Sequence, residues 1–295
     1  MSPIQRVGVL GGGLMGSGIA QVCAMAGCQT IVREISESLS EKSRGNIDKS
    51  LAKAVKNEKI TPEQRDATLS RLSFTTDVRR LSESDIVIEA VSEDLELKNS
   101  LWKELSSVCP PATIFASNTS SLTIAAMAVS CGRPDRMLGL HFFNPVPAMK
   151  LVEVVRTITT SQETEDAALA FVKQLGKEPI RAKDNSGFVV NLLLVPYMLD
   201  AIRALEASVA SVEDIDKGMQ LGAGHPMGPF TLLDFVGLDT VFKISEIMFT
   251  EYREKRFAPP PLLKRMVTAG MFGKKTGRGF YDYSETPPRV SALGL

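Results

Sequence analysis

The chain is predicted to fold as an α/β Rossmann-type domain, with a doubly wound and mostly parallel sheet, followed by an all-α C-terminal domain. Three observations carry this prediction. A short apolar run at residues 6–10 leads directly into the glycine-rich segment 11–16. Strand-like and helix-like segments then alternate, which is typical of parallel sheets whose strands are joined by helices. From about Gly187 onward, long segments with helical periodicity replace the strand-like runs.

The expected elements of the first domain follow from this alternation. Apolar runs indicate strands at residues 6–10, 29–32, 85–89, 113–116, 136–142 and 151–155. Apolar residues at intervals of three and four indicate helices at residues 14–26, 36–57, 62–72, 92–108 and 121–129. Ser121 is a residue type that caps helix N-termini, so it is expected to begin the last of these helices.

The second domain is predicted to be helical throughout. Its helices are expected at residues 188–207, 212–221, 230–252 and 262–269. The run Lys-Asp-Asn-Ser-Gly at residues 183–187 supplies turn chemistry and a helix cap. The predicted domains are therefore residues 1–184 and residues 185–295.

Composition narrows the function classes. The chain has 295 residues, enough for two cores, and its 34 Lys and Arg balance its 34 Asp and Glu. A net charge of zero argues against nucleic-acid and membrane partners. The four cysteines lack paired metal-ligand spacing, so we expect reduced thiols and no metal site. A strand beginning by Val7 leaves no room for a leader, and no apolar run reaches membrane-spanning length, so a cytoplasmic protein is expected.

The segment 11–16 has the pattern G-x-G-x-x-G in the context that a dinucleotide requires, after a strand and before a helix. Gly11 permits a tight turn, Gly13 lets the backbone approach a pyrophosphate, and Gly16 allows close packing of helix and strand. Backbone N–H groups and the helix dipole then favour an anion. The loop, with Leu14 and Met15, is therefore predicted to bind the cofactor; the alternative is a tight turn without a ligand.

Glu34 follows the second predicted strand. A carboxylate there can accept hydrogen bonds from ribose hydroxyls and repels a 2′-phosphate, which favours NAD over NADP. Arg33 beside it keeps NADP open, because an arginine at this place can accommodate that phosphate.

His141 is one of only two histidines, and it ends a predicted strand just before Asn-Pro. Glu153 lies inside an apolar, strand-like run, where a carboxylate needs a partner. An imidazole that gains a proton during a reaction is a suitable partner, so the pair suggests hydride transfer with His141 as general base. For His141 alone, a structural role is the competing interpretation. His225 is interpreted as a loop residue.

Two further polar residues occupy unusual places. Ser120 follows the strand 113–116 at its carboxyl end, where ligands bind in open α/β sheets. Asn191 interrupts an apolar helix. A helix cap for the serine and a satisfied polar contact between helices for Asn191 are the alternatives.

The chain resembles the 3-hydroxyacyl-CoA dehydrogenases, including the short-chain 3-hydroxybutyryl-CoA dehydrogenases, over nearly its whole length. The segments that carry the resemblance are FASNTSSL (115–122), HFFNPVP (141–147), MKLVEV (149–154), GFVVN (187–191), LGAGHPMGPF (221–230) and FGKKTGRGFYDY (272–283). The resemblance implies NAD-dependent interconversion of (S)-3-hydroxyacyl-CoA and 3-oxoacyl-CoA, with short chains, by a homodimer formed through the helical domain.

The resemblance also implies residue roles. His141 would be the base, Glu153 would orient it, and Ser120 and Asn191 would bond the reacting oxygen or the substrate near it. The cofactor would further contact Glu93, Lys98, Ser120, Asn144 and Lys275. From the sequence alone, Glu93, Lys98 and Lys275 are equally compatible with ordinary surface charges.

The residues that bind the coenzyme A part of the substrate, called the coenzyme A handle below, are expected on the helix 36–57. Lys49, Lys53 and Lys56 share one face of it, which suits the phosphates of coenzyme A. By resemblance the substrate contacts on this helix are Ser50 and position 57, where relatives usually have Lys and this chain has Asn57. Lys53 is the expected compensation, and a solvated helix face is the alternative.

Leu192 stands where the family commonly has Arg, so a local ion pair is expected to be missing. Two other functions stay open. One is oxidation of a free hydroxy acid, as in the gulonate dehydrogenase-like crystallins, which need no coenzyme A handle. The other is a structural NAD-binding protein without activity. The tail 284–295 is expected either to lack order or to contact a neighbour.

Overall fold

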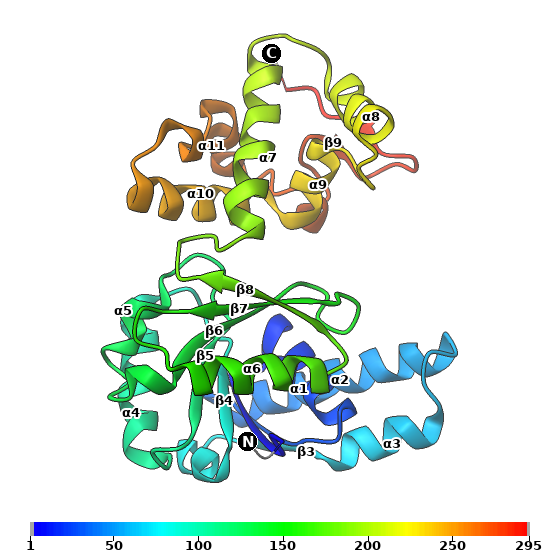
Figure 1. Cartoon of the computed structure of the whole chain (residues 1–295). Helices are drawn as coiled ribbons and strands as arrows, with labels where there is room; N and C mark the ends of the chain where they lie inside the picture. Colours follow the sequence, from blue (N-terminus) through cyan, green and yellow to red (C-terminus); the bar gives the residue numbers. More distant parts are fainter. Residues whose placement is uncertain (1–2, 294–295) are drawn as a thin grey trace. The chain divides into compact units, whose positions relative to one another are not determined.

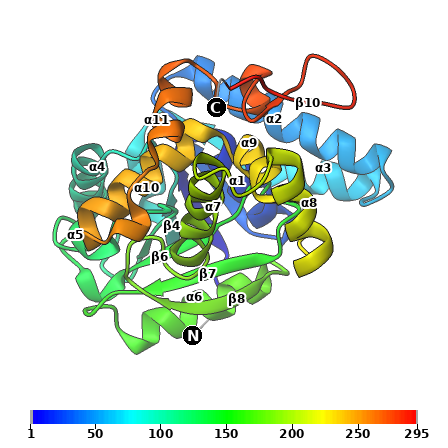
Figure 2. The ribbon, with the colours of Figure 1, turned by 90° about the horizontal axis from the view of Figure 1, so that it is seen from above.

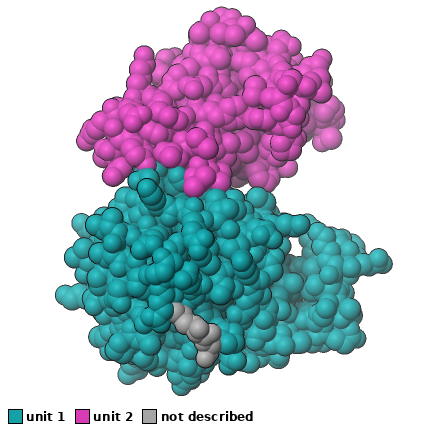
Figure 3. Space-filling view, in the orientation of Figure 1, with its two compact units in different colours: residues 1–188 teal, residues 189–295 magenta. Residues whose placement is uncertain are grey.

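The computed structural model describes residues 3–293, which form two compact units (Figure 3). Unit 1 ends at Phe188 and unit 2 begins at Val189. Unit 1 is an α/β unit with a Rossmann-like sheet and unit 2 is mainly helical, so the predicted fold class is confirmed. Within residues 3–293, no helix is both long enough and apolar enough to cross a membrane.

An eight-stranded sheet forms the centre of unit 1, in the order β3-β2-β1-β4-β5-β6-β7-β8 (Figure 1). Every neighbouring pair is parallel except β6 and β7. The carboxyl ends of β1, β4, β5 and β6 therefore lie at one edge of the sheet. The strands are β1 (Arg6–Leu10), β2 (Gln29–Arg33), β3 (Leu72–Thr75), β4 (Ile86–Glu89), β5 (Ile114–Ser117), β6 (Met137–Phe142), β7 (Leu151–Arg156) and β8 (Glu178–Lys183).

Helices cover both faces of this sheet, because alternate strand residues point to opposite faces. Val7 and Val9 of β1 join the core under α1, α2 and α6, whereas Leu10 joins the core under α4 and α5. The helices of unit 1 are α1 (Leu14–Met25), α2 (Glu37–Lys56), α3 (Pro62–Ser70), α4 (Leu95–Val108), α5 (Ile124–Ala128) and α6 (Gln162–Gln174), with 3₁₀ turns η1 (Val78–Glu83) and η2 (Pro134–Arg136).

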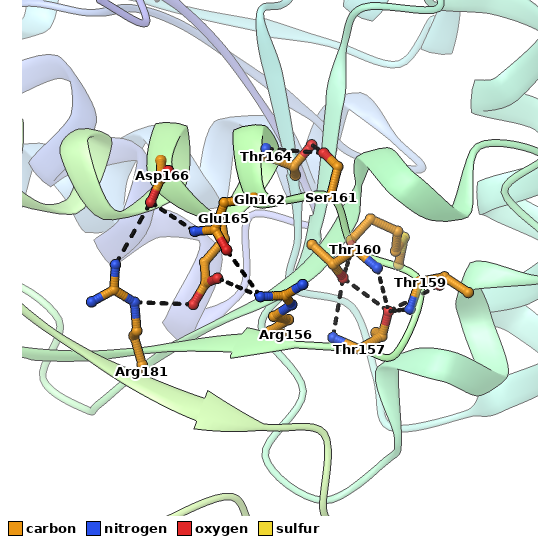
Figure 4. Close-up of polar contacts among 11 residues, drawn as sticks. Arg156, Thr157, Thr159, Thr160, Ser161, Gln162, Thr164, Glu165, Asp166 and Arg181 are labelled. Atoms are coloured by element: carbon orange, nitrogen blue, oxygen red, sulfur yellow. Dashed lines mark hydrogen bonds and ion pairs between the residues drawn. The ribbon is translucent and has the colours of Figure 1, made fainter.

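A polar cluster ties the last two strands to α6 (Figure 4). The buried carboxylate of Glu165 on α6 accepts hydrogen bonds from Arg156 of β7 at 3.2 Å and from Arg181 of β8 at 3.1 Å. Asp166 pairs with the same Arg181 at 3.6 Å. These contacts join β7 and β8 to α6.

Unit 2 packs its helices around a second apolar core, in which the rings of Phe230 and Phe280 contact each other at a tilt, with 4.6 Å between ring centroids. Helix α9 contacts both α7 and α8 (Figures 1 and 2). The elements are α7 (Val190–Glu206), α8 (Val212–Ala223), α9 (Pro229–Val236), α10 (Leu238–Tyr252), α11 (Pro261–Thr268), the 3₁₀ turns η3 (Lys255–Phe257) and η4 (Lys274–Thr276), and the strands β9 (Tyr281–Asp282) and β10 (Arg289–Val290).

A buried carboxylate holds the segment before β9 against α9. Asp234 accepts hydrogen bonds from the backbone N–H groups of Phe280 and Tyr281 and from the hydroxyl of Tyr283. A Cβ at position 279 would lie 2.0 Å from the Oδ1 atom of Asp234, so only Gly279 fits there. This explains the glycine in the run Gly-Phe-Tyr-Asp-Tyr.

Two predicted helices are wrong at their bounds. The helix expected at residues 62–72 ends at Ser70, and Leu72 begins β3 instead. The helix expected at residues 230–252 is two helices, because Gly237 has a φ of +100° that separates α9 from α10. The elements β3, α6 and β8 and the 3₁₀ turns were not predicted, and the helical second unit also contains the short strands β9 and β10.

Both predicted caps are also wrong. Ser121 does not cap α5, whose N-cap residue is Thr123. The first N–H groups of α5, from Ile124 and Ala125, donate instead to Asp184, each at 2.7 Å. The segment 183–187 was expected to cap a helix of the second domain. It caps a helix of unit 1 instead, because the tertiary fold places the carboxylate of Asp184 at the N-terminus of α5.

The four cysteines are buried and form no disulfide, and burial raises the pKa of each thiol. The tail remains partly ordered, since β10 pairs with β9 and the N–H of Ser291 donates to the carbonyl of Phe280 at 2.9 Å. Its last residues, 294 and 295, lie outside the described residues.

Candidate active site

The candidate site is the edge of the sheet where β1, β4, β5 and β6 end. Strand register sets Leu10 beside Glu89, Glu89 beside Ser117, and Ser117 beside Gly139. The residues that follow each strand therefore share one edge, which is where open α/β sheets bind their ligands. The glycine loop, the segment 118–120 and His141 all come from this edge.

Of the three glycines in the pattern G-x-G-x-x-G, two are required by the fold and one is not. Gly11 has a φ of +84°, and a Cβ there would lie 2.9 Å from the carbonyl oxygen of Ala90. A Cβ on Gly16 would lie 1.7 Å from the carbonyl oxygen of Gly11. A Cβ on Gly13, by contrast, would meet no heavy atom of the described residues within 4 Å. Position 13 therefore borders open space at the N-terminus of α1.

This open space suits a pyrophosphate. Gly13 is the N-cap residue of α1, and the first turn of that helix carries no acidic side chain. Unpaired N–H groups and the helix dipole there attract an anion. Leu14, the first residue of the helix, is 73% exposed, so no other part of unit 1 covers this end of the helix. The backbone N–H groups of this first turn and the lack of a side chain at Gly13 fit the pyrophosphate of a dinucleotide cofactor.

Glu34 lies at the loop as well. Its Oε1 atom accepts a hydrogen bond from the N–H of Gly12 at 2.6 Å, and its Oε2 atom accepts one from the N–H of Ile35 at 3.2 Å. The carboxylate is thereby held next to the glycine loop, in the position expected for a group that bonds a ribose. Arg33 beside it is half-buried.

His141 and Glu153 face each other across the antiparallel pair β6–β7. They are register partners, and the Nδ1 atom of His141 lies 2.5 Å from the Oε2 atom of Glu153. The histidine is 5% exposed and the glutamate 0%. Phe143 and Phe188 pack on the imidazole at 4.5 and 5.6 Å between ring centroids. Because Nδ1 is bound to the carboxylate, Nε2 is the nitrogen that can exchange a proton with a substrate.

The segment after β5 is held by hydrogen bonds to Glu93 on one side and to the end of β6 on the other. Glu93 accepts hydrogen bonds from the N–H of Ser120 at 3.1 Å and from the hydroxyl of Thr119 at 2.9 Å. Asn118 turns the other way, and its Oδ1 atom accepts a hydrogen bond at 2.9 Å from the N–H of Phe142, the residue after His141. Ser120 is thus positioned by its backbone, and its half-buried side chain lies at the same edge as the histidine.

Sequence reasoning missed Glu89, the last residue of β4. Glu89 is fully buried, and its Oε1 atom lies 2.5 Å from the Nζ atom of Lys98. Lys98 is 1% exposed, so it is not the surface charge that the sequence left open. No local signal marks Glu89, because an acid that ends an apolar strand has the same sequence pattern whether it is buried or solvated.

The remaining predicted residues are placed as follows. Ser50 is half-buried on α2, whereas Lys53 and Asn57 are exposed on the same helix and Asn57 is its C-cap. Asn144 is exposed just after β6. None of these four contacts the His141–Glu153 pair through a hydrogen bond or ion pair recorded within residues 3–293.

Asn191 and Lys275 belong to unit 2. Asn191 is half-buried in the first turn of α7. The Nζ atom of Lys275 pairs with Asp239 at 2.5 Å. His225 lies in the loop after α8, where its Nδ1 atom is 3.1 Å from the hydroxyl of Tyr197. Leu192 packs against the apolar core of unit 2.

Comparison with known proteins identifies the relatives of this chain. The family model for the 3-hydroxyacyl-CoA dehydrogenase NAD binding domain matches residues 6–185, and the model for the C-terminal domain of the same family matches residues 187–283. A 3-hydroxybutyryl-CoA dehydrogenase of Mycobacterium tuberculosis is 52% identical over 282 residues, covering 95% of this chain and 99% of the relative.

Two further relatives agree. The mitochondrial hydroxyacyl-coenzyme A dehydrogenase of Homo sapiens is 48% identical over 287 residues, covering 95% of this chain and 91% of the relative. Among solved structures, (S)-3-hydroxybutyryl-CoA dehydrogenase PaaH1 from Ralstonia eutropha matches with a TM-score of 0.92 and 43% identity, covering 96% of this chain and all of that one (100%).

Proposed function

Since the chain belongs to the 3-hydroxyacyl-CoA dehydrogenase family, we propose that it interconverts short-chain (S)-3-hydroxyacyl-CoA and 3-oxoacyl-CoA thioesters, with the pair 3-hydroxybutyryl-CoA and acetoacetyl-CoA as its substrates. It is an NAD-dependent oxidoreductase. The observation that supports the proposed reaction is the buried His141–Glu153 pair, at 2.5 Å, at the sheet edge that also carries the glycine loop. Beta-oxidation and butanoate metabolism are the pathways in which such a reaction belongs.

NAD, when bound, accepts a hydride from C3 of the substrate or, in its reduced form, returns one. The residues that would hold it are the loop residues Gly11, Gly13, Leu14, Met15 and Gly16, followed by Glu34, Glu93, Lys98, Ser120, Asn144 and Lys275. Two observations support this assignment: the space beside Gly13 and the carboxylate of Glu34 at the N–H of Gly12. Glu34 would select NAD by repelling a 2′-phosphate.

His141 would move the proton. In the oxidative direction its Nε2 atom takes the proton of the 3-hydroxyl, and in the reductive direction the imidazolium returns that proton to the ketone oxygen. Glu153 would hold the tautomer through Nδ1 and stabilise the imidazolium by its charge. Ser120 and Asn191 would donate hydrogen bonds to the oxygen at which negative charge develops.

The coenzyme A handle is proposed on α2, with Ser50, Lys53 and Asn57. Lys53 lies one turn before Asn57 on the same face, and its exposed ammonium supplies the charge that Asn57 lacks. Leu192 packs against the apolar core of unit 2, so the ion pair that the family's arginine would form at this position is absent from the proposal.

We also propose that residues 1–184 form the NAD-binding domain and residues 185–295 the substrate and dimerisation domain of a cytoplasmic homodimer. Exposed apolar side chains on unit 2 support an association surface there. These are Leu193 at 64%, Leu221 at 78% and Phe235 at 52% exposure.

The test is a panel of substrates with the purified protein. NADH and NADPH are each offered with acetoacetyl-CoA and with free acetoacetate, and oxidation of the reduced cofactor is followed. We expect rapid turnover with NADH and acetoacetyl-CoA only. Turnover of free acetoacetate at a similar rate would replace the proposal by a hydroxy-acid dehydrogenase, and NADH binding without turnover of either substrate would indicate a non-catalytic protein.

A further inference from the structure

A buried lysine precedes β8. Lys177 is 7% exposed, and it forms no ion pair with any carboxylate of residues 3–293. Its Nζ atom donates instead to the backbone carbonyls of Val146 and Met149, each at 2.7 Å. Both acceptors belong to the loop 143–150, which joins β6 to β7 and therefore joins His141 to Glu153 along the chain. The proposed acid–base pair is thus connected by a loop that a buried ammonium holds.

The local fold aims Lys177 at this loop. Helix α6 ends in a left-handed turn at Gly176, whose φ is +70°, and the N–H of Lys177 closes the turn by donating to the carbonyl of Val172 at 3.2 Å. Directly after it, the N–H of Glu178 donates to the carbonyl of Lys150 at 2.9 Å. The backbone at position 177 is therefore fixed between the end of α6 and the start of the β7–β8 pairing.

The loop packs on the site and is held from a second side. Phe143, at its start, packs on the imidazole of His141 with 4.5 Å between ring centroids. Val146 is 2% exposed and lies over Gly18 of α1, where an added Cβ would come within 2.8 Å of the Cβ atom of Val146. The loop is therefore clamped between α1, the helix that begins at the glycine loop, and the ammonium of Lys177.

The charge of Lys177 is not needed merely to fill this space. A neutral donor would satisfy the two carbonyls at a smaller cost, since a buried ammonium must give up its hydration. Burial accordingly lowers the pKa of Lys177. What the ammonium adds is a pair of charge-assisted, directional bonds to two points of one loop. Such bonds define the position of the loop more strictly than apolar packing does.

We propose that Lys177 is a positioning residue for the site, which sets the loop 143–149 and through it the placement of Asn144 relative to His141. The proposal rests on the proposed function, in which Asn144 contacts the cofactor and His141 moves the proton. Lys177 acts through the backbone of the loop, because its hydrogen bonds end at loop carbonyls. A displacement of about 1 Å at such a site costs roughly 100-fold in rate.

Two substitutions disturb the loop from opposite sides. Lys177→Met keeps the length of the side chain and removes its donors, whereas Gly18→Ala leaves Lys177 in place and pushes on Val146 from α1. The matched controls are Lys173→Met, at an exposed lysine of α6, and Gly218→Ala, at an exposed glycine of α8 where a Cβ would point into open space. For each variant we would measure kcat, the KM for acetoacetyl-CoA, the dissociation constant of NADH and unfolding in urea.

In Lys177→Met we expect the dissociation constant of NADH to rise about threefold to 10-fold and kcat to fall about 10-fold to 100-fold, with the KM for acetoacetyl-CoA within about twofold of the wild type. Gly18→Ala should show the same pattern to a smaller degree, and the controls should change none of these quantities. A Lys177→Met protein that is less stable in urea but keeps wild-type kcat and NADH affinity would overturn the proposal. If Lys177→Met does not fold, wild-type kcat and affinity in Gly18→Ala overturn it equally.

Amide hydrogen exchange separates this proposal from the proposed function, since it needs no turnover. The N–H groups of Ala148 and Met149 both donate to the carbonyl of Pro145, at 2.9 and 3.0 Å, so their exchange reports on the loop. We expect both amides to exchange faster in Lys177→Met, with no change in β2, which lies in the other half of the sheet. Unchanged exchange at both amides, or faster exchange throughout unit 1, would contradict positioning even if the wild type proves inactive on acyl-CoA.

Discussion

His141 and Glu153 are register partners on β6 and β7, with the Nδ1 and Oε2 atoms 2.5 Å apart. The antiparallel pairing explains the spacing of these two residues in the sequence, because a hairpin returns β7 beside β6 and sets both side chains on one face. Every other neighbouring pair of strands in this sheet is parallel.

The charge of Glu153 should matter more than its shape. Replacing it in Glu153→Gln keeps a group able to bond the imidazole, but it removes the carboxylate that stabilises the imidazolium and fixes its tautomer. We expect kcat to fall by about 100-fold or more, by analogy with the loss when an orienting carboxylate is neutralised in other acid–base catalysts. Steady-state kinetics at saturating NADH measures this, and NADH affinity should be unchanged. A kcat within about threefold of the wild type would contradict it.

Glu34 should set cofactor preference. In Glu34→Gln the repulsion of a 2′-phosphate is lost while Arg33 remains, so the ratio of kcat/KM for NADPH to that for NADH should rise about 10-fold or more. Glu41→Gln, on the exposed face of α2, is the control. An unchanged ratio would mean that the carboxylate serves only the N–H of Gly12.

Lys53, on the basic face of α2, should affect the binding of acetoacetyl-CoA and not the binding of NADH. In Lys53→Ala the KM for acetoacetyl-CoA should rise about threefold to 10-fold, with a weaker dependence on salt, because one phosphate contact is lost. Asn57→Lys should lower the same KM. Lys103→Ala is the control, and equal effects of Lys53→Ala on the KM for NADH and for acetoacetyl-CoA would contradict a dedicated handle.

Stability should depend on pH through Asp234. Burial raises the pKa of this carboxyl to about 6, from an ordinary value of 3.8, and the hydrogen bonds from Tyr281, Phe280 and Tyr283 only partly oppose that rise. The folded state therefore binds this proton more tightly than the unfolded state. The contribution of protonated Asp234 to the free energy of unfolding is fully present below about pH 4 and is lost as the pH rises through about 6.

The measurement compares wild type with Asp234→Asn in urea unfolding between pH 4 and pH 7. The difference in unfolding free energy between them should shift by up to about 3 kcal/mol across this window, with the wild type favoured at the acidic end. Asp200→Asn, at an exposed aspartate, should show no such shift. A difference that does not vary with pH would show that Asp234 is ionised throughout.

The sequence predicted the fold class because strand runs, helical periodicity and the glycine loop are local signals. His141, Glu153 and Ser120 stood out for the same reason, as polar residues where a strand should be apolar or should end. Glu89 did not, since a run such as Ile-Val-Ile-Glu has the same pattern whether its acid is buried or solvated. Its partner Lys98 arrives only when α4 packs on the sheet.

Other errors have similar physical causes. Asp184 caps α5 through tertiary contact, which no neighbouring residue indicates. The break at Gly237 depends on a backbone conformation that the apolar pattern of residues 230–252 does not reveal. The strand β3 has no fully buried residue and includes the exposed Ser73, so it lacks the apolar run by which strands were recognised.

The most direct test of the central claim is kcat for reduction of acetoacetyl-CoA by NADH in His141→Ala, measured beside His225→Ala and the wild type. His225, the other histidine of the chain, bonds Tyr197 in unit 2 and is the matched control. If His141 transfers the proton, kcat falls by about 100-fold or more in His141→Ala, with NADH affinity retained, and stays near the wild-type value in His225→Ala. Equal activity of all three proteins would contradict the acid–base role of His141.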